Sequence, residues 1–153
     1  MATVEHTLVI VKPDGVQRGL SGEIIARLER RGLKIVALKF ARVTEEQAAR
    51  HYAEHEGKGF YPGLMAFITS GPSVLMVLEG PRAIDITRHA MGGATDPLTA
   101  GQGSIRGDFG LEIGRNLVHG SANAADATRE IPNFFAPDEL VAYERALDRW
   151  IIE

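Results

Sequence analysis

Short apolar runs alternate along the chain with amphipathic segments, and polar or glycine-containing breaks separate them. Runs rich in β-branched residues predict buried strands over Thr7–Val11, Leu33–Val43 and Ser73–Leu78. A fourth strand is predicted over Ile113–His119, because a glycine follows it directly. The first run ends in Lys-Pro-Asp-Gly, a turn signal, so a loop is expected after it.

Helices are predicted between these strands, where apolar residues recur every three or four positions and capping residues come first. The predicted helices cover residues 21–31, 44–54, 60–69, 81–91, 121–131 and 140–147. Thr44 and Ser121 are the expected caps of two of them, and Pro81 occupies the first turn of a third. Residues 92–110 show no periodicity, and long irregular segments of this kind are usually functional.

The predicted order is strand–helix–strand, helices, then strand–helix–strand. Four antiparallel strands with helices packed on one face form a split βαβ arrangement, so the fold class predicted is a ferredoxin-like α+β sandwich. No low-complexity linker, like-charge block or internal repeat interrupts the chain, which predicts one domain over residues 1–153.

Composition narrows the possible functions. The chain carries 17 Lys and Arg against 20 Asp and Glu, a net charge of −3, which argues against a general nucleic-acid or anionic-membrane surface but leaves room for a local cationic site. It has no cysteine, so disulfides, cysteine-ligated metals and thiol nucleophiles are excluded. No apolar run approaches the ~18–20 residues needed to span a bilayer, and no basic leader is present, so we expect a cytoplasmic protein without a membrane segment.

His119 is the main candidate for covalent chemistry. It ends a predicted strand and is followed by Gly120 and Ser121, so its imidazole can face a cleft near a helix N-terminus that favours anions. Glu130 could fix the tautomer of this ring, provided that the helix carrying it folds back beside the strand. The alternatives are a histidine that only packs or caps and a glutamate that pairs with Arg129 or water.

Cationic and aromatic side chains supply candidate contacts to a phosphorylated ligand. Lys12 lies between a strand and a helix, although the GxxxxGK[ST] spacing of a P-loop is missing. Guanidinium groups match phosphate oxygens bidentately, which makes Arg88, Arg106 and Arg115 candidates, although most surface arginines are merely solvated. The adjacent rings of Phe60 and Tyr61 follow a glycine turn and could stack on a base, although core packing is favoured for at least one of them. Tyr52 is ambiguous in the same way.

Several motifs together resemble the nucleoside diphosphate kinase family over nearly the whole chain. They are KPDGVQRGL at 12–20, HYAEH at 51–55, SGP at 70–72, GATDP at 93–97, SIRGDFG at 104–110, and GRNLVHGS at 114–121 with Glu130 and the ending WIIE. The resemblance implies a ferredoxin-like fold and transfer of the γ-phosphate of a nucleoside triphosphate, typically ATP, to a nucleoside diphosphate by a ping-pong mechanism. This activity would maintain nucleoside triphosphate pools.

The resemblance also implies residue roles. His119 would carry the phosphoryl group on Nδ1, supported by Tyr52 and Glu130. The nucleotide-binding residues would be Lys12 and Asn116 near the ribose hydroxyls, Arg88, Thr95 and Arg106 at the phosphates, and Phe60 stacked on the base. Mg²⁺ would be bound through the nucleotide phosphates and not by a dedicated protein site. The partners expected are nucleoside tri- and diphosphates and further copies of the chain, with a homohexamer favoured by the WIIE ending and a homotetramer as the alternative.

Two positions depart from the family pattern. Ala122 stands where an acidic residue usually follows HGS, and the segment between Arg88 and Thr95 is one residue longer, at Gly92-Gly93. Two other functions are kept as alternatives: a ferredoxin-like nucleotide-binding regulator that has no turnover, and an added nucleic-acid-binding role, which the net charge of −3 makes unlikely.

Overall fold

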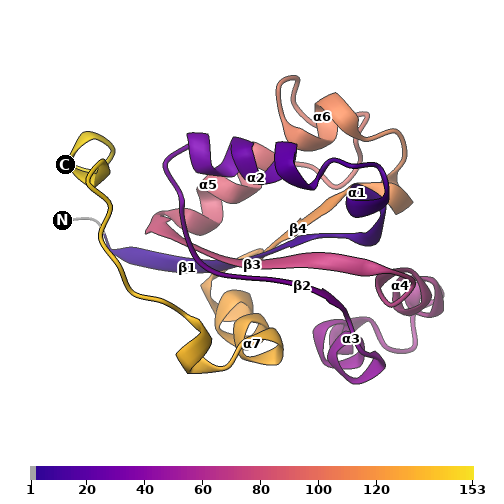
Figure 1. Cartoon of the computed structure of the whole chain (residues 1–153). Helices are drawn as coiled ribbons and strands as arrows, with labels where there is room; N and C mark the ends of the chain where they lie inside the picture. The colour runs from indigo at the N-terminus through magenta and orange to yellow at the C-terminus, as the bar shows by residue number, and fades with distance from the viewer. Residues whose placement is uncertain (1–2) are drawn as a thin grey trace.

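A computed structural model describes residues 3–153. In this part of the chain four strands, β1 (Val4–Val11), β2 (Lys34–Arg42), β3 (Pro72–Pro81) and β4 (Val118–Gly120), form one sheet in the order β2-β3-β1-β4 (Figure 1). All three strand pairs are antiparallel. The predicted ferredoxin-like α+β fold is confirmed.

Strand β1 is apolar on both of its faces. Leu8 and Ile10 belong to one buried cluster, whereas Val9 and Val11 belong to a second one on the opposite side of the sheet. Alternate side chains of a strand point to opposite faces. The unbroken apolar run in the sequence is therefore the sign of a strand that is buried on both sides.

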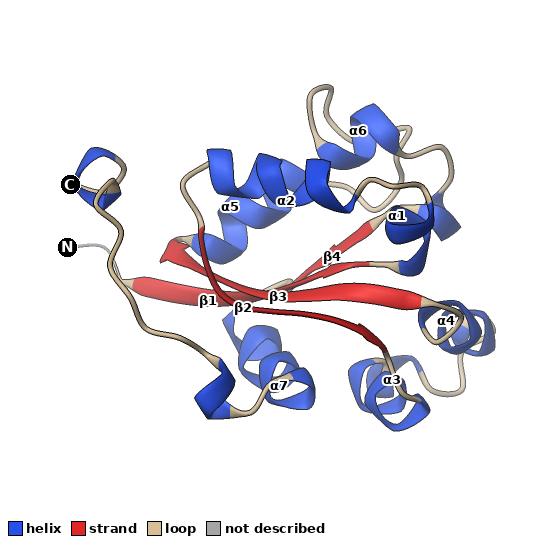
Figure 2. Ribbon diagram, viewed as in Figure 1, coloured by secondary structure: helices blue, strands red, loops and turns tan. Residues whose placement is uncertain are grey.

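Helices cover both faces of the sheet (Figure 2). One layer contains α2 (Ser21–Arg30) and α5 (Ala83–Met91), which contribute residues to the cluster of Val9 and Val11. The other contains α3 (Glu45–His51), α4 (Tyr61–Ile68) and α7 (Ala124–Phe134), which pack around Leu8 and Ile10. The expectation of helices on one face only is wrong, because the side chains of both faces of β1 need cover.

Several predicted elements have different bounds or a different conformation. The loop expected after β1 is a short helix, α1 (Pro13–Gln17), which starts with a proline. Within the region predicted to be irregular, α6 (Ile105–Phe109) is capped by Ser104. Strand β4 covers Val118–Gly120 only, since residues 113–115 form a 3₁₀ turn. Pro81 ends β3 and does not open α5, which begins at Ala83.

The segments after β4 also differ from the prediction. Helix α7 is capped by Asn123, whose side chain accepts a hydrogen bond from the Asp126 amide, and not by Ser121. Asn123, next to Ala122, therefore supplies the helix cap. The helix predicted over residues 140–147 is absent from the structure, and 3₁₀ turns flank this segment at Pro137–Glu139 and Asp148–Trp150. Another 3₁₀ turn, Ala53–His55, follows α3.

Two glycines shape the loop after α5. Gly92 and Gly93 have φ values of 132° and 70°, which other residues rarely adopt. A Cβ at Gly92 would lie 2.7 Å from the Ala100 Cβ and 2.9 Å from the Ser104 Oγ. The glycine pair thus lets the loop turn tightly against α6 before it reaches Thr95.

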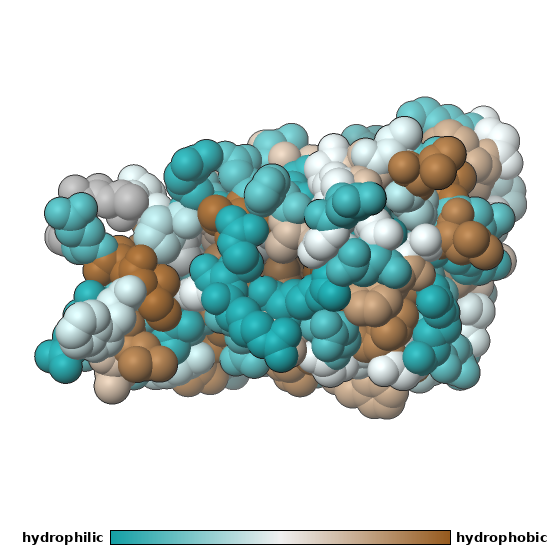
Figure 3. Space-filling model, turned by 90° about the horizontal axis from the view of Figure 1, so that it is seen from above, coloured by the Kyte–Doolittle hydropathy of each residue, from teal (hydrophilic) through white to brown (hydrophobic). Residues whose placement is uncertain are grey.

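The C-terminal segment runs back along the edge strand β2. The Val141 amide donates to the Val36 carbonyl, and the Tyr143 hydroxyl donates to the Ile35 carbonyl. Figure 3 shows a mostly hydrophilic face over α2 with hydrophobic side chains gathered at the end where the two termini lie and over the segment around α6. Trp150, Ile151, Leu98 and Leu111 are among the exposed large hydrophobic residues. None of the helices that the structure describes is long and apolar enough to cross a membrane.

Candidate active site

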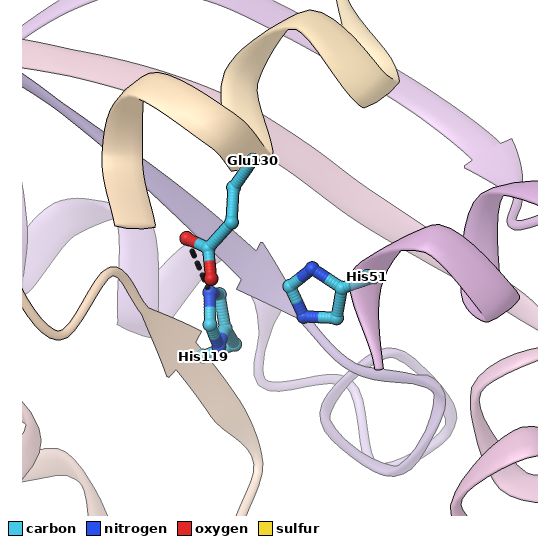
Figure 4. Close-up of side chains that lie close together, drawn as sticks. All are labelled: His51, His119 and Glu130. Carbon is cyan, nitrogen blue, oxygen red and sulfur yellow. Dashed lines mark hydrogen bonds and ion pairs between the residues drawn. The ribbon is translucent and has the colours of Figure 1, made fainter. Parts of the chain in front are cut away.

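The His119 imidazole and the Glu130 carboxylate are in direct contact. His119 Nε2 lies 3.2 Å from Glu130 Oε1 (Figure 4). The Ser121 hydroxyl donates to the same oxygen at 2.7 Å. Helix α7 does fold back beside β4, so the condition set for this contact is met. Burial alone would raise the pKa of Glu130, but the hydrogen bonds and charge of His119 and the Ser121 hydroxyl outweigh it and lower that pKa.

The pairing of β4 with β1 fixes the position of the His119 imidazole. His119 lies opposite Ile10 in the β1–β4 ladder, and Gly120 and Ser121 turn the chain toward α7. A Cβ at Gly120 would meet the Met91 sulfur at 2.7 Å and a Thr87 methyl carbon at 2.9 Å, so only glycine lets β4 pack this closely on α5. With Nε2 held by Glu130, Nδ1 is the ring nitrogen left for chemistry.

His51 packs against the His119 ring, with their centroids 4.7 Å apart and their planes at 79°. Burial lowers the pKa of His51 to about 3, so this imidazole is neutral. Tyr52 contacts His51 at 4.8 Å between centroids, and burial raises the pKa of its phenol to about 12. His51 was not singled out from the sequence, although the motif HYAEH at 51–55 contains it.

Lys12, Asn116 and Thr95 form a second contact group. The Lys12 ammonium donates to the Asn116 side-chain oxygen, and the Asn116 amide donates to the Thr95 carbonyl at 3.1 Å. The Thr95 residue itself is exposed. The loop after α5 is thereby tied to the segment before β4, so three of the predicted residues do lie together.

Arg106 is buried, and it donates to three backbone carbonyls. Nε donates to Asn116, Nη1 to Ala94 and Nη2 to Val118 at 3.1, 2.9 and 2.6 Å. Its guanidinium therefore holds the two segments of the Lys12 group together, a role that the sequence did not indicate. Arg88 donates to the Gly120 carbonyl at 3.2 Å, next to His119.

Among the described residues, none of these cations is paired directly with a carboxylate, although the charge of Asp14 acts on Lys12 and Arg106. In the described part of the chain, none of Lys12, Arg88, Arg106 and Arg115 has a carboxylate within 4.0 Å. Burial and then the charge of Arg106 lower the pKa of Lys12 to about 8, and burial and then Arg88 lower the pKa of Arg106 to about 10. Such mutual repulsion favours a bound anion.

Asp14 is a further residue that the sequence did not single out. Its Oδ2 accepts a hydrogen bond from the Leu117 amide at 3.0 Å, and the charge of Asp14 counteracts the lowering of the Lys12 pKa. Leu117 is buried and has a φ of 77°, which is rare for a residue with a side chain. The Pro-Asp-Gly signal indicated a turn, and nothing in it indicated a partner 103 residues away.

Phe60 stands apart from these groups, just before α4. Its side chain is 55% exposed, and its ring centroid lies 5.3 Å from that of His55. The core-packing alternative for Phe60 is therefore wrong, whereas Tyr52 is mostly buried. An exposed ring of this kind is available for stacking.

The residues of the site do not offer an oxygen-lined cage for Mg²⁺. His51, His119 and Glu130 form the only cluster of three potential metal ligands in the part of the chain that the structure describes, and two of these ligands are nitrogens. Mg²⁺ prefers six oxygens and keeps much of its water. The site fits a Mg²⁺ ion that is brought by nucleotide phosphates, whose charge the four cations complement.

A histidine held by a carboxylate beside unpaired cations, on a ferredoxin-like sheet, defines a phosphotransferase class. The family model described as "Nucleoside diphosphate kinase" matches residues 5–140. The chain belongs to the nucleoside diphosphate kinase family, as the sequence resemblance predicted, and it is a kinase that transfers the γ-phosphate of a nucleoside triphosphate to a nucleoside diphosphate.

Relatives resemble the chain over its whole length. It is 61% identical to a nucleoside diphosphate kinase of Thermomicrobium roseum, covering 97% of this chain and 99% of that one, and 55% identical to one of Archaeoglobus fulgidus, covering 98% and 99%. A halophilic nucleoside diphosphate kinase of Halobacterium salinarum, solved in complex with CDP, is 52% identical with a TM-score of 0.95 and covers 99% of this chain and all of that one. A family protein of Babesia bovis is 48% identical with a TM-score of 0.93, covering 96% and 99%.

Proposed function

We propose that His119 is the nucleophile of the kinase and carries the phosphoryl group on Nδ1 between two half-reactions. The observation that carries this proposal is the contact of Nε2 with Glu130 at 3.2 Å, which leaves Nδ1 with its lone pair. In the first half-reaction Nδ1 attacks the γ-phosphorus, the N–P bond forms, and the bond to the bridging oxygen breaks, releasing the diphosphate. In the second, a terminal oxygen of another diphosphate attacks the same phosphorus and restores the free imidazole.

Glu130 and Ser121 would stabilise the charge that the ring acquires. Nε2 keeps its proton and donates it in a hydrogen bond to Glu130 throughout, while the phosphorylated imidazole becomes positive. The Ser121 hydroxyl holds the carboxylate and also accepts from the Leu8 amide at 3.0 Å, so the carboxylate is anchored to β1. Tyr52, which touches His51, would support the ring from the other side.

The cations would position the phosphates. Lys12, Arg88 and Arg106 neutralise charge on the transferred group, which is the main source of catalysis in phosphoryl transfer. Asn116 and Lys12 would reach the ribose hydroxyls, the Thr95 hydroxyl a phosphate, and Phe60 would stack on the base. Mg²⁺ bound to the nucleotide phosphates would offset their remaining charge.

Labelling tests the proposal. Incubation with γ-labelled ATP is expected to leave a label on the protein that acid removes and base does not, and His119→Ala is expected to lack it. His89→Ala, which removes an exposed imidazole, is the matched control. Equal labelling of His119→Ala and the unsubstituted protein would reject His119 as the nucleophile.

The chain would also associate with copies of itself, as a homohexamer or a homotetramer. Exposed hydrophobic residues near the chain terminus and around α6 support this, since soluble monomers seldom expose grouped apolar side chains. Light scattering at several protein concentrations distinguishes a hexamer from a tetramer, and a monomeric mass would reject the proposal.

A further inference from the structure

Three potential metal ligands meet at the active site. One ligand atom each from His51, His119 and Glu130 lies within 4.8 Å of the other two. Figure 4 shows the two imidazoles beside one another below the Glu130 carboxylate, each carried by a different element. His51 and Glu130 are 6% and 4% exposed, whereas the His119 side chain is 24% exposed, so an ion has access from solvent on the side of His119.

In the phosphoryl transfer proposed above, His51 only packs against the His119 ring and forms no bond to a reacting atom. Its Nδ1 is buried and has no hydrogen-bond partner among the described residues. A buried polar atom without a partner is unusual in a folded protein and asks for an explanation. The imidazole already lies edge-on to the His119 ring, so a ligand shared by the two histidines would give His51 a bonding partner.

Two imidazoles and one carboxylate are a ligand set of zinc sites, where water occupies the fourth position. We propose that His51, His119 and Glu130 bind a divalent transition-metal ion such as Zn²⁺ or Co²⁺, and that this ion inhibits phosphoryl transfer. His119 Nε2 and Glu130 Oε1 are 3.2 Å apart. Two tetrahedral ligands at about 2.1 Å from an ion lie about 3.4 Å apart, so this pair already has the spacing of two zinc ligands. The ligand atom of His51, which lies within 4.8 Å of those of the other two residues, would be the third.

Inhibition follows from the tautomer of His119. An ion bound at Nε2 takes that nitrogen's lone pair, and the ring proton moves from Nε2 to Nδ1. Nδ1 then lacks the lone pair that attacks the γ-phosphate. Mg²⁺ does not compete well for this site, because it prefers oxygen ligands. The inhibition rests on the proposed role of His119, whereas the binding of the ion does not.

Metal binding is tested on the full chain without nucleotide, because nucleotide phosphates chelate the same ions. Calorimetry with Zn²⁺ is expected to show one binding site per chain, and excess Mg²⁺ is expected not to displace the ion. Bound Co²⁺ is expected to show the visible absorption typical of a low coordination number. His51→Phe keeps the ring volume but removes the ligand. Its affinity is expected to fall at least about tenfold, since even residues behind a ligand are worth about 10–100-fold.

The control is His6→Gln, which removes a histidine that contacts Glu79 at 2.8 Å on the surface and is expected to change nothing. Unchanged affinity and Co²⁺ absorption in His51→Phe would overturn the site. If that variant does not fold, as judged by circular dichroism, the same readouts on His51→Gln decide. The inhibition is tested by single-turnover labelling of the Zn²⁺-loaded protein with much less Mg·ATP than protein, so that the nucleotide cannot remove most of the ion. Full labelling would overturn inhibition and leave the site. No labelling of the metal-free protein would instead reject the proposed function.

Discussion

The Asp14 carboxylate accepts a hydrogen bond from the buried Leu117 amide at 3.0 Å. In return the Leu117 carbonyl accepts from the Lys12 amide at 2.9 Å. A Cβ at Gly15 would lie 3.1 Å from that carbonyl and 2.8 Å from Val11 Cγ1, so the turn after β1 can approach Leu117 only because position 15 is glycine. These contacts join the segment that carries Lys12 to the one that carries Asn116 and His119.

Asp14→Ala is expected to lower the free energy of unfolding by about 1–3 kcal/mol, because the Leu117 amide loses its partner and its left-handed backbone loses its restraint. Asp14→Asn keeps an acceptor oxygen and should lose clearly less. Urea denaturation of both variants measures the difference. Equal losses would mean that the charge of Asp14, and not the hydrogen bond, stabilises this region.

The affinity for nucleotide is expected to fall as the pH rises through about 8, where Lys12 loses its proton. Burial lowers the Lys12 pKa, so the ammonium is charged below that value and neutral above it. Bound phosphates favour the charged form, so kcat should decline at a higher pH than kcat/KM. In Lys12→Arg the side chain stays charged over this pH range, so the kcat/KM of this variant should not decline near pH 8. A decline at the same pH in Lys12→Arg would mean that another group is responsible for the decline.

Glu130→Gln is expected to lower kcat roughly 10²-fold with little change in KM, because the amide no longer stabilises a positive phosphoimidazole. The matched control is Glu139→Gln, which removes an exposed carboxylate that pairs with Lys39. Steady-state kinetics separate the two parameters. A rise in KM at constant kcat would show that Glu130 serves binding and not the chemical step.

Phe60→Ala is expected to raise the Kd for a nucleoside diphosphate about tenfold and to leave stability almost unchanged. Stacking on an aromatic ring is worth about 1–3 kcal/mol per base, whereas the Phe60 ring is already 55% exposed and adds little to the core. Titration with a labelled nucleoside diphosphate and thermal unfolding measure the two effects. Tyr61→Ala is the neighbouring control, and equal loss of affinity in both variants would argue against specific stacking by Phe60.

Features of this protein that depend on local physics could be predicted from the order of its residues. The apolar run of β1 required a strand, the Thr44 capping box started α3 as predicted, and the motifs around His119 identified the family. Local sequence patterns predicted the conformation less well where tertiary contacts determine it. The segment over residues 140–147 has the spacing of a helix, yet its backbone lies along β2, where Val36 and Ile35 accept its hydrogen bonds.

The candidate site could be described only from the sequence and the tertiary structure together. Residue types and spacing selected His119, Glu130 and the cations, but only the packing of α7 against β1 and β4 brings the Glu130 carboxylate to the imidazole. Only the tertiary structure placed the neutral His51 beside His119, turned Arg106 toward three carbonyls and joined Asp14 to Leu117. Contacts between residues about 10 to 100 positions apart depend on how whole elements pack, and no local pattern in the chain encodes that geometry.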